Sequence, residues 1–279
     1  MSALELFGYP REHGGAGARN HVLVLPSVVC STRVAEQVAG DDAVSVTHQH
    51  GCGQVGDDVT NSSRLFVGMA TNPNVAGVVV VGLGCETIGG PGLAEEIARA
   101  HQHVAFVGIQ ACGGSAATVA AGVAERQALV EAARRLERQP VPAASLRVGL
   151  DDPDAPFAAA LAAALSDAGA SLVLPGTAQR GELAHAELAA AGATVIVAWC
   201  GPGEGPRSFA VVPVLSVSGD PVLAAALGED FDDRVEPGEE DAAGMRLAAA
   251  AAACFSGVPC AAERRGAAEF TLPRLARSM

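Results

Sequence analysis

The chain contains no lysine, and all 18 of its basic residues are arginine. A Schiff base formed by a lysine of this chain is therefore excluded. Acidic residues outnumber the basic ones, and the formal net charge is −13 at pH 7. Because nucleic acids and anionic membranes are bound through basic patches, this charge argues against both as partners.

Long apolar runs are also missing. No segment approaches the roughly 18 apolar residues that a membrane-spanning helix needs. The first five residues, Met1–Glu5, lack the basic start and the apolar centre of a signal peptide. The seven cysteines are odd in number and not closely spaced, which is typical of reduced thiols rather than of a disulfide framework. We therefore expect a cytoplasmic protein without a membrane segment.

Short valine-rich segments alternate with segments of helical pattern along the chain. Strands are expected at 21–26, 44–47, 75–82, 104–109, 145–150, 171–175, 193–199 and 211–217. Near-continuous apolar strands separated by helices indicate parallel sheets that are covered on both faces. Residues 139–142, with two prolines, have the pattern of a linker. The sequence thus predicts an α/β protein of two consecutive parallel-sheet, Rossmann-like units, over residues 1–140 and 141–279.

Two polar clusters follow two of these expected strands. Residues 48–54, His-Gln-His-Gly-Cys-Gly-Gln, come directly after the strand 44–47, and Cys85 and Glu86 follow the strand 75–82. In an open α/β sheet, ligands bind at the carboxyl ends of the strands. We therefore expect one site built from both clusters. Cys30 is expected near a helix N-terminus, where the helix dipole favours a thiolate.

Several short motifs, in the same order along the chain, resemble those of the altronate/galactarate dehydratase family, which includes the large subunit of sulfolactate sulfo-lyase. They are Gly8–Arg11 with Arg19–Asn20, His48–Gln54, Asn72–Asn74, Gly82–Glu86, Gln110 with Gly113–Gly114, and scattered residues of 256–270. The resemblance covers residues 6–140 well, residues 210–279 in patches, and nothing between them. Asp151–Asp154 stands where the family has a cysteine- and glycine-rich motif. The family's small N-terminal domain has no counterpart here, so the resemblance implies a shortened, divergent member that a small partner subunit would complete.

The resemblance implies a carbon–oxygen lyase that eliminates water, or sulfite, from a hydroxylated carboxylic or sugar acid. Such an enzyme removes a proton beside a carboxylate. The expected catalytic residues are His48, His50 and Glu86. The expected substrate contacts are Arg11, Arg19, Asn20, Gln54 and Gln110. Which histidine would act as base and which as ligand is left open.

A divalent metal can stabilise the enediolate formed in such a reaction and polarise the leaving hydroxyl. His50, Cys52, Cys85 and Cys30 offer nitrogen and sulfur ligands for one Fe2+ or Mn2+, which is the first expectation. The cysteines alone would instead suit an iron–sulfur cluster with one open iron. A protein without metal is the third alternative.

Two other function classes stay open. The missing second-half motif favours a non-catalytic binding or assembly subunit. A hydrolase or transferase could instead use Cys52 or Cys85 as a nucleophile beside histidine. In each case we expect a homo-oligomer and, for the enzyme, a small hydroxy acid as substrate.

Overall fold

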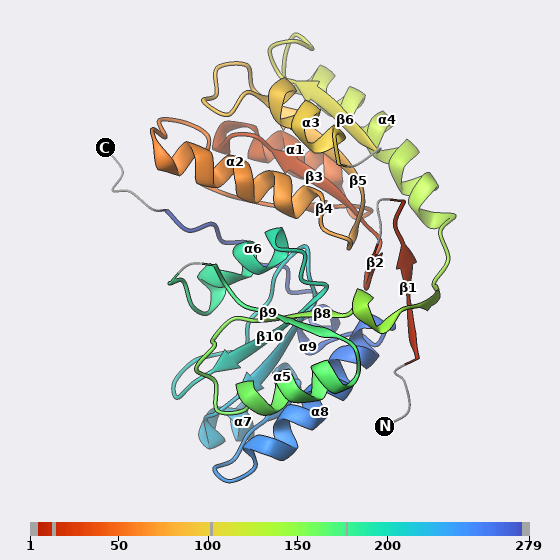
Figure 1. Cartoon of the computed structure of the whole chain (residues 1–279). Coiled ribbons are helices and arrows are strands. Elements are labelled where there is room, and N and C mark those ends of the chain that lie inside the picture. The colour runs from red at the N-terminus through yellow and green to blue at the C-terminus, as the bar shows by residue number, and fades with distance from the viewer. Residues whose placement is uncertain (1–4, 13–14, 101–102, 177, 275–279) are drawn as a thin grey trace.

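Two parallel sheets organise the computed structural model, which describes residues 5–12, 15–100, 103–176 and 178–274 (Figure 1). The first sheet has the strand order β4-β3-β5-β6 and the second the order β12-β11-β10-β8-β9. The strands of the first are β3 (His21–Pro26), β4 (Val44–Ser45), β5 (Val75–Gly82) and β6 (Val104–Gly108). Those of the second are β8 (Arg147–Leu150), β9 (Ser171–Val173), β10 (Val195–Cys200), β11 (Val214–Ser218) and β12 (Asp233–Arg234). Every pairing within these two sheets is parallel, so the predicted α/β class is confirmed.

The valine run of β5 shows why both faces of the first sheet are covered. Side chains of successive strand residues point to opposite faces. Val78 and Val80 pack on the side of α2 (Asp57–Ala70) and α3 (Gly90–Ala98). Val79 and Val81 pack on the side of α1 (Thr32–Ala39) and α4 (Ser115–Arg134). A strand buried on both sides needs apolar residues at every position, which is what this sequence provides.

The second sheet is sandwiched in the same way. On one face lie α5 (Ala158–Asp167) and α8 (Glu240–Phe255), and on the other lies α6 (Glu182–Ala190). The short helices α7 (Pro221–Ala226) and α9 (Ala261–Arg264) complete this half. Gly244 lets α8 approach α5 closely, because a Cβ there would lie 2.5 Å from the Cβ of Ala160.

A third, antiparallel sheet of three short strands ties the ends of the first unit together. Its order is β2-β1-β7, with β1 (Leu6–Pro10), β2 (Ala16–Gly17) and β7 (Gln139–Val141). The segment predicted as a linker is therefore partly a strand, since β7 pairs with β1 from Gln139 to Val141. The expected strand 145–150 is also shorter than predicted, because residues Ala143–Ser145 form a 3-10 turn. Two further 3-10 turns cover Val29–Ser31 and Gly228–Asp230.

The first parallel sheet is formed by residues before position 140 and the second by residues after it. One apolar cluster nevertheless contains residues from both halves. Helices α2 and α6 pack against each other, and Arg64 bonds Glu187 at 2.7 Å across this contact. The Asn72 amide donates to the carbonyls of Ala189 and Ala193, at 2.8 and 2.9 Å. The division into two domains at residue 140 therefore stays a prediction. No helix in the described part of the chain is both long and apolar enough to cross a membrane.

Candidate functional site

The loops that follow β3, β4 and β5 meet at one edge of the first sheet. The order β4-β3-β5 means that the chain leaves β3 toward one side and later returns to its other side, which makes this edge a topological switch point. The amide of Val29 donates to the carbonyl of His50 at 2.9 Å, and the amide of Thr87 donates to the carbonyl of Gly51 at 3.0 Å. The two polar clusters therefore adjoin, and one site built from both stays a prediction.

Gly51 makes the closest of these contacts possible. Its φ of +90° is in the region that favours glycine. A Cβ at this position would lie 2.3 Å from the carbonyl oxygen of Ser27. We call residues 48–54 the histidine loop. Only glycine at position 51 lets this loop lie so close to the end of β3.

Two side chains hold His50, one from α2 and one from the loop before α2. Its Nδ1 lies 2.8 Å from Nε2 of Gln54 and 3.2 Å from Oγ of Ser62. The Gln54 carboxamide is oriented by the Gly51 amide, which donates to Oε1 at 2.8 Å, so Nε2 faces the ring as a donor. A ring that accepts at Nδ1 carries its own proton on Nε2. Burial lowers the pKa of His50, and the positive charge of Arg274 lowers it further, while a hydrogen bond to the Leu272 backbone opposes this shift.

His48 has both ring nitrogens engaged by the backbone. Its Nε2 donates to the carbonyl of Pro26 at 2.7 Å, and its Nδ1 accepts from the amide of His50 at 3.2 Å. The ring packs on Phe66, with the two ring centres 4.8 Å apart. Burial lowers the pKa of His48 to about 4. In this arrangement His48 braces the loop and offers no free nitrogen to a substrate or a metal.

Glu86 organises the neighbouring loop. Its carboxylate accepts from the Ser27 hydroxyl at 3.0 Å and from the amides of Leu83, Gly84 and Gly90. Burial alone would raise the pKa of Glu86, but these donors lower it on balance. An ionised carboxylate with four donors is a poor proton acceptor, and its bond to Gly90 also anchors the start of α3.

The sulfur atoms proposed as metal ligands lie around the same edge. Cys30, Cys52 and Cys85 are all free and exposed. Gln110 is beside them, because its side chain fills the space next to Gly84. Yet within the described residues no group of three or more His, Cys, Asp or Glu side chains is arranged to hold a metal ion. The donors do not fit a preformed centre here, so we assign no catalytic step to a metal or cluster, and both stay predictions.

The predicted role of three residues as substrate contacts beside His50 requires a correction. Arg11, Arg19 and Asn20 lie at the opposite edge of the sheet. They precede β3, whereas the histidine loop follows β4, so the length of the strands separates them. The Arg11 guanidinium donates to the carbonyls of Pro73 and Arg19 and to Oδ1 of Asn20, at 2.6, 3.0 and 2.8 Å. These residues do not share a site with His50.

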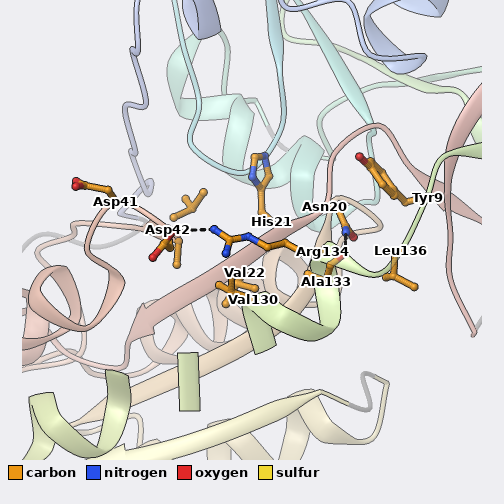
Figure 2. Close-up of a pocket in the computed structure, with 12 residues that line it drawn as sticks. Tyr9, Asn20, His21, Val22, Asp41, Asp42, Val130, Ala133, Arg134 and Leu136 are labelled. Carbon is orange, nitrogen blue, oxygen red and sulfur yellow. Dashed lines mark hydrogen bonds and ion pairs between the residues drawn. The ribbon is translucent and has the colours of Figure 1, made fainter. Parts of the chain in front are cut away.

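The Arg19 side chain is also held by bonds within the protein. It makes a two-pronged ion pair with Glu263 and donates to the carbonyl of Cys254 at 2.8 Å. Asn20 donates to the carbonyl of Ala133 at 2.7 Å and lines a separate cavity of about 440 Å³ (Figure 2). Figure 2 shows that His21, Asp42 and Arg134 surround that cavity, with Arg134 paired to Asp42.

The pocket beside His50 is lined in part by a segment near residue 270, which the sequence did not connect with His50. A cavity of about 510 Å³ is lined by the histidine loop, by Thr32 at the start of α1, and by residues Phe270–Arg274. Arg274 donates to the carbonyl of Gln49 at 2.8 Å, and Leu272 is buried in the core that both halves share. Ser62 was also missed. Ser62 follows Gln54 by only eight residues, on the next helix. Residues 270–274 are more than 200 positions from the motif, so no local pattern could have identified them.

Comparison with known proteins agrees with the resemblance drawn from the motifs. Residues 8–134 match the family model of D-galactarate dehydratase/altronate hydrolase, second domain. Altronate dehydratase of Bacillus subtilis (strain 168) is 32% identical over 160 residues, which are 51% of this chain and 31% of that protein. Altronate dehydratase of Escherichia coli (strain K12) is 37% identical over 90 residues, 28% of this chain and 18% of that protein.

The (2R)-sulfolactate sulfo-lyase subunit beta of Chromohalobacter salexigens is 41% identical over 78 residues, 27% of this chain and 20% of that protein. The aligned stretches thus cover about a third or less of these relatives. The family model covers β3 to β6 and their loops, including the loop that carries His50. Through residues 8–134, this chain is similar to the second domain of the D-galactarate dehydratase/altronate hydrolase family.

Proposed function

We propose that this chain supplies a lyase site that eliminates water, or sulfite, from a hydroxylated carboxylic or sugar acid. The observation that carries the proposal is the placement of His50. It is oriented by Gln54 and Ser62 at the wall of a cavity of about 510 Å³, on the switch-point edge of the family domain. Relatives of that domain are named as altronate dehydratases and as a sulfo-lyase subunit.

The reaction needs a proton donor as well as a base. A proton leaves the carbon beside the carboxylate, the carbon–oxygen bond breaks, and the departing hydroxyl takes up a proton to leave as water. His50 with its proton on Nε2 suits the donor role, because that proton can pass from its bond with the Leu272 backbone to the leaving hydroxyl or to the developing enediolate. The direction of its pKa shift favours the neutral ring.

His50 cannot also be the base in the same tautomer, because its Nδ1 already accepts from Gln54. We assign the proton acceptor to Cys52, whose exposed sulfur stands two residues further along the same loop. In this role the sulfur accepts the proton from carbon and then passes it to solvent, which resets the site. Glu86 and His48 then act as positioning residues, since their partners hold the loops in place.

The test is an assay of the purified chain with galactarate, altronate and sulfolactate, with Fe2+ or Mn2+ added or withheld, following formation of the keto acid. We expect His50→Gln to lower kcat by about a hundredfold or more, as loss of a general acid does. His103→Gln is the matched control, because His103 is exposed and precedes β6 at the other edge. Equal activity of the two variants would refute the assignment.

A second candidate is a non-catalytic binding or assembly subunit. It is favoured by the short aligned share of the relatives, at most 31% of their length, and by the name of one relative as a subunit. In that case galactarate would bind saturably without turnover, and a small partner subunit would co-purify and restore activity. Turnover by the isolated chain would exclude this candidate. Hydrolysis or group transfer, rather than keto acid formation, that iodoacetamide abolishes regardless of chelators would instead support the thiol nucleophile.

A further inference from the structure

The second sheet has a switch point of its own, with a cavity beside it. In the order β12-β11-β10-β8-β9, strand β8 lies between the strands that follow it in sequence, β9 and β10. A cavity of about 460 Å³ lies at the carboxyl ends of these strands. Its lining comes from the loop after β8, the start of α6 and the segment from the end of β10 onward. Open α/β sheets bind ligands at such crevices.

A buried carboxylate braces the wall of this cavity. Asp151 is fully buried, and its Oδ2 accepts from Arg207 at 2.7 Å and from His185 at 3.1 Å. Its Oδ1 accepts from the amide of Trp199 at 2.9 Å. Arg207 also pairs with Glu204 at 2.8 Å. These bonds join four segments of the second half, so the wall is preorganised and Arg207 is already neutralised.

Other groups of the wall keep bonding capacity for a ligand. The Arg180 side chain is 45% exposed, and its nearest carboxylate oxygen, in Asp152, is 3.7 Å from Nε. Its Nη1 donates to the adjacent carbonyl of Gln179, at 3.1 Å. The exposed Glu182 carboxylate has no hydrogen bond or ion pair with a residue in the described ranges. Arg180 therefore offers a cation, and Glu182 an anion, on the same wall.

Apolar surface completes the cavity. The Trp199 ring is half-buried and is seated against Gly219, where a Cβ would lie 2.3 Å from the ring. The neighbouring Leu183 is 41% exposed and also lines the cavity. An indole face and a leucine side chain suit an aliphatic group of a small ligand.

The charges on the wall select the class of ligand. Two arginines and three carboxylates line the cavity, and Arg207 is already paired. A dicarboxylate would meet more acidic than basic groups, and an amine without a carboxylate would make no use of the exposed Arg180 guanidinium. A ligand with one carboxylate and one ammonium can bond both Arg180 and Glu182.

We propose that this cavity is a second ligand site, separate from the His50 pocket, that binds a small zwitterion of the α-amino acid type. The ligand carboxylate bonds Arg180, its ammonium bonds Glu182, and its aliphatic side chain packs on Trp199 and Leu183. The site does not depend on the lyase assignment, because none of its residues lines the His50 pocket.

Trp199 makes the proposal directly testable, since it is the single tryptophan of the chain and lines this cavity. We expect L-leucine to change the tryptophan fluorescence saturably, with a Kd below about 10 mM. Isocaproate lacks the ammonium and isoamylamine lacks the carboxylate, so each should bind about tenfold or more weakly. No saturable change with leucine, isocaproate binding as tightly as leucine, or tighter binding of galactarate would each overturn the proposal.

Variants identify the groups involved. Arg180→Gln and Glu182→Gln should each weaken leucine binding by about tenfold or more, because each removes one charge-assisted bond. Arg134→Gln is the control, as its exposed arginine also pairs with an aspartate but lies in α4 of the first half. Circular dichroism checks that the variants are folded. His50→Gln should leave leucine binding unchanged, and a loss of binding in that variant would refute the independence of the two sites.

Discussion

The carboxamide of Gln54 donates to Nδ1 of His50 at 2.8 Å, and this contact determines which chemistry the histidine can perform. Because Gln54 is itself oriented by the Gly51 amide, the histidine must accept at Nδ1 and carry its proton on Nε2. The same motif therefore supplies the reactive ring and the group that sets its tautomer.

The first prediction changes that contact. In Gln54→Glu a carboxylate faces Nδ1, so it should favour the imidazolium and raise the pKa of His50. A pH titration of the histidine ring protons by NMR measures this directly, without any assay of activity. Gln49→Glu adds the same charge at an exposed position of the same loop and serves as the control. An identical His50 titration in both variants would show that residue 54 does not control the ring.

The second prediction concerns Arg19, which was expected to bind substrate and instead pairs with Glu263 at the other edge. Its side chain is only 12% exposed, so Arg19→Gln leaves a poorly hydrated carboxylate without its partner. We expect a loss of about 3 kcal/mol in the free energy of unfolding, measured in urea. Arg33→Gln, at an arginine that is 78% exposed, should change it by less than about 0.5 kcal/mol. A raised KM with unchanged stability would restore the substrate-binding role.

The third prediction is a pH dependence of stability. The pKa of His48 is about 4 in the folded chain, against an ordinary value of 6.5. Between these values the unfolded chain binds a proton at His48 that the folded chain does not, so stability falls as the pH decreases below about 6.5. At pH 5 the contribution of His48 should be a loss of about 2 kcal/mol relative to pH 7.5. Urea unfolding at both pH values should show a smaller difference in His48→Gln, and an equal difference would contradict the assignment.

The fourth prediction addresses metal. No three donors converge among the described residues, so protein purified without air should hold clearly less than one iron or manganese per chain. Elemental and acid-labile sulfide analysis of wild type and Cys52→Ser decides this. One metal per chain that is lost in Cys52→Ser would support the mononuclear site expected from the sequence. Near four irons with matching sulfide would support the cluster.

Much of the fold could be read from residue patterns. The run Val78–Val81 predicts a strand buried on both faces, and the structure places alternate valines on opposite sides. The position of the histidine loop was also predictable, because a segment that follows a parallel strand must emerge at the carboxyl edge. By the same reasoning Arg11 and Arg19, which precede β3, belong at the amino edge. Assigning them to the histidine site overlooked their order along the chain.

The partners of the site residues could not be predicted. Nothing in the sequence shows that His48 bonds the carbonyl of Pro26, or that Leu272 and Arg274 lie beside the histidine loop. The Asp151 cluster was visible only as acidic residues after a strand, because His185 and Arg207 are 34 and 56 residues away from it.

The sequence by itself determined the α/β class, the strands of the first parallel sheet and the loop that carries His50, because hydrophobic periodicity and local motifs act over a few residues. Only the tertiary structure decided which side chains are free to react. His48, Glu86, Arg11 and Arg19 are all polar residues of plausible motifs, yet each is held by backbone or by an ion pair. The physical reason is that a buried polar group must find a partner, and that partner is supplied by segments that only folding brings together.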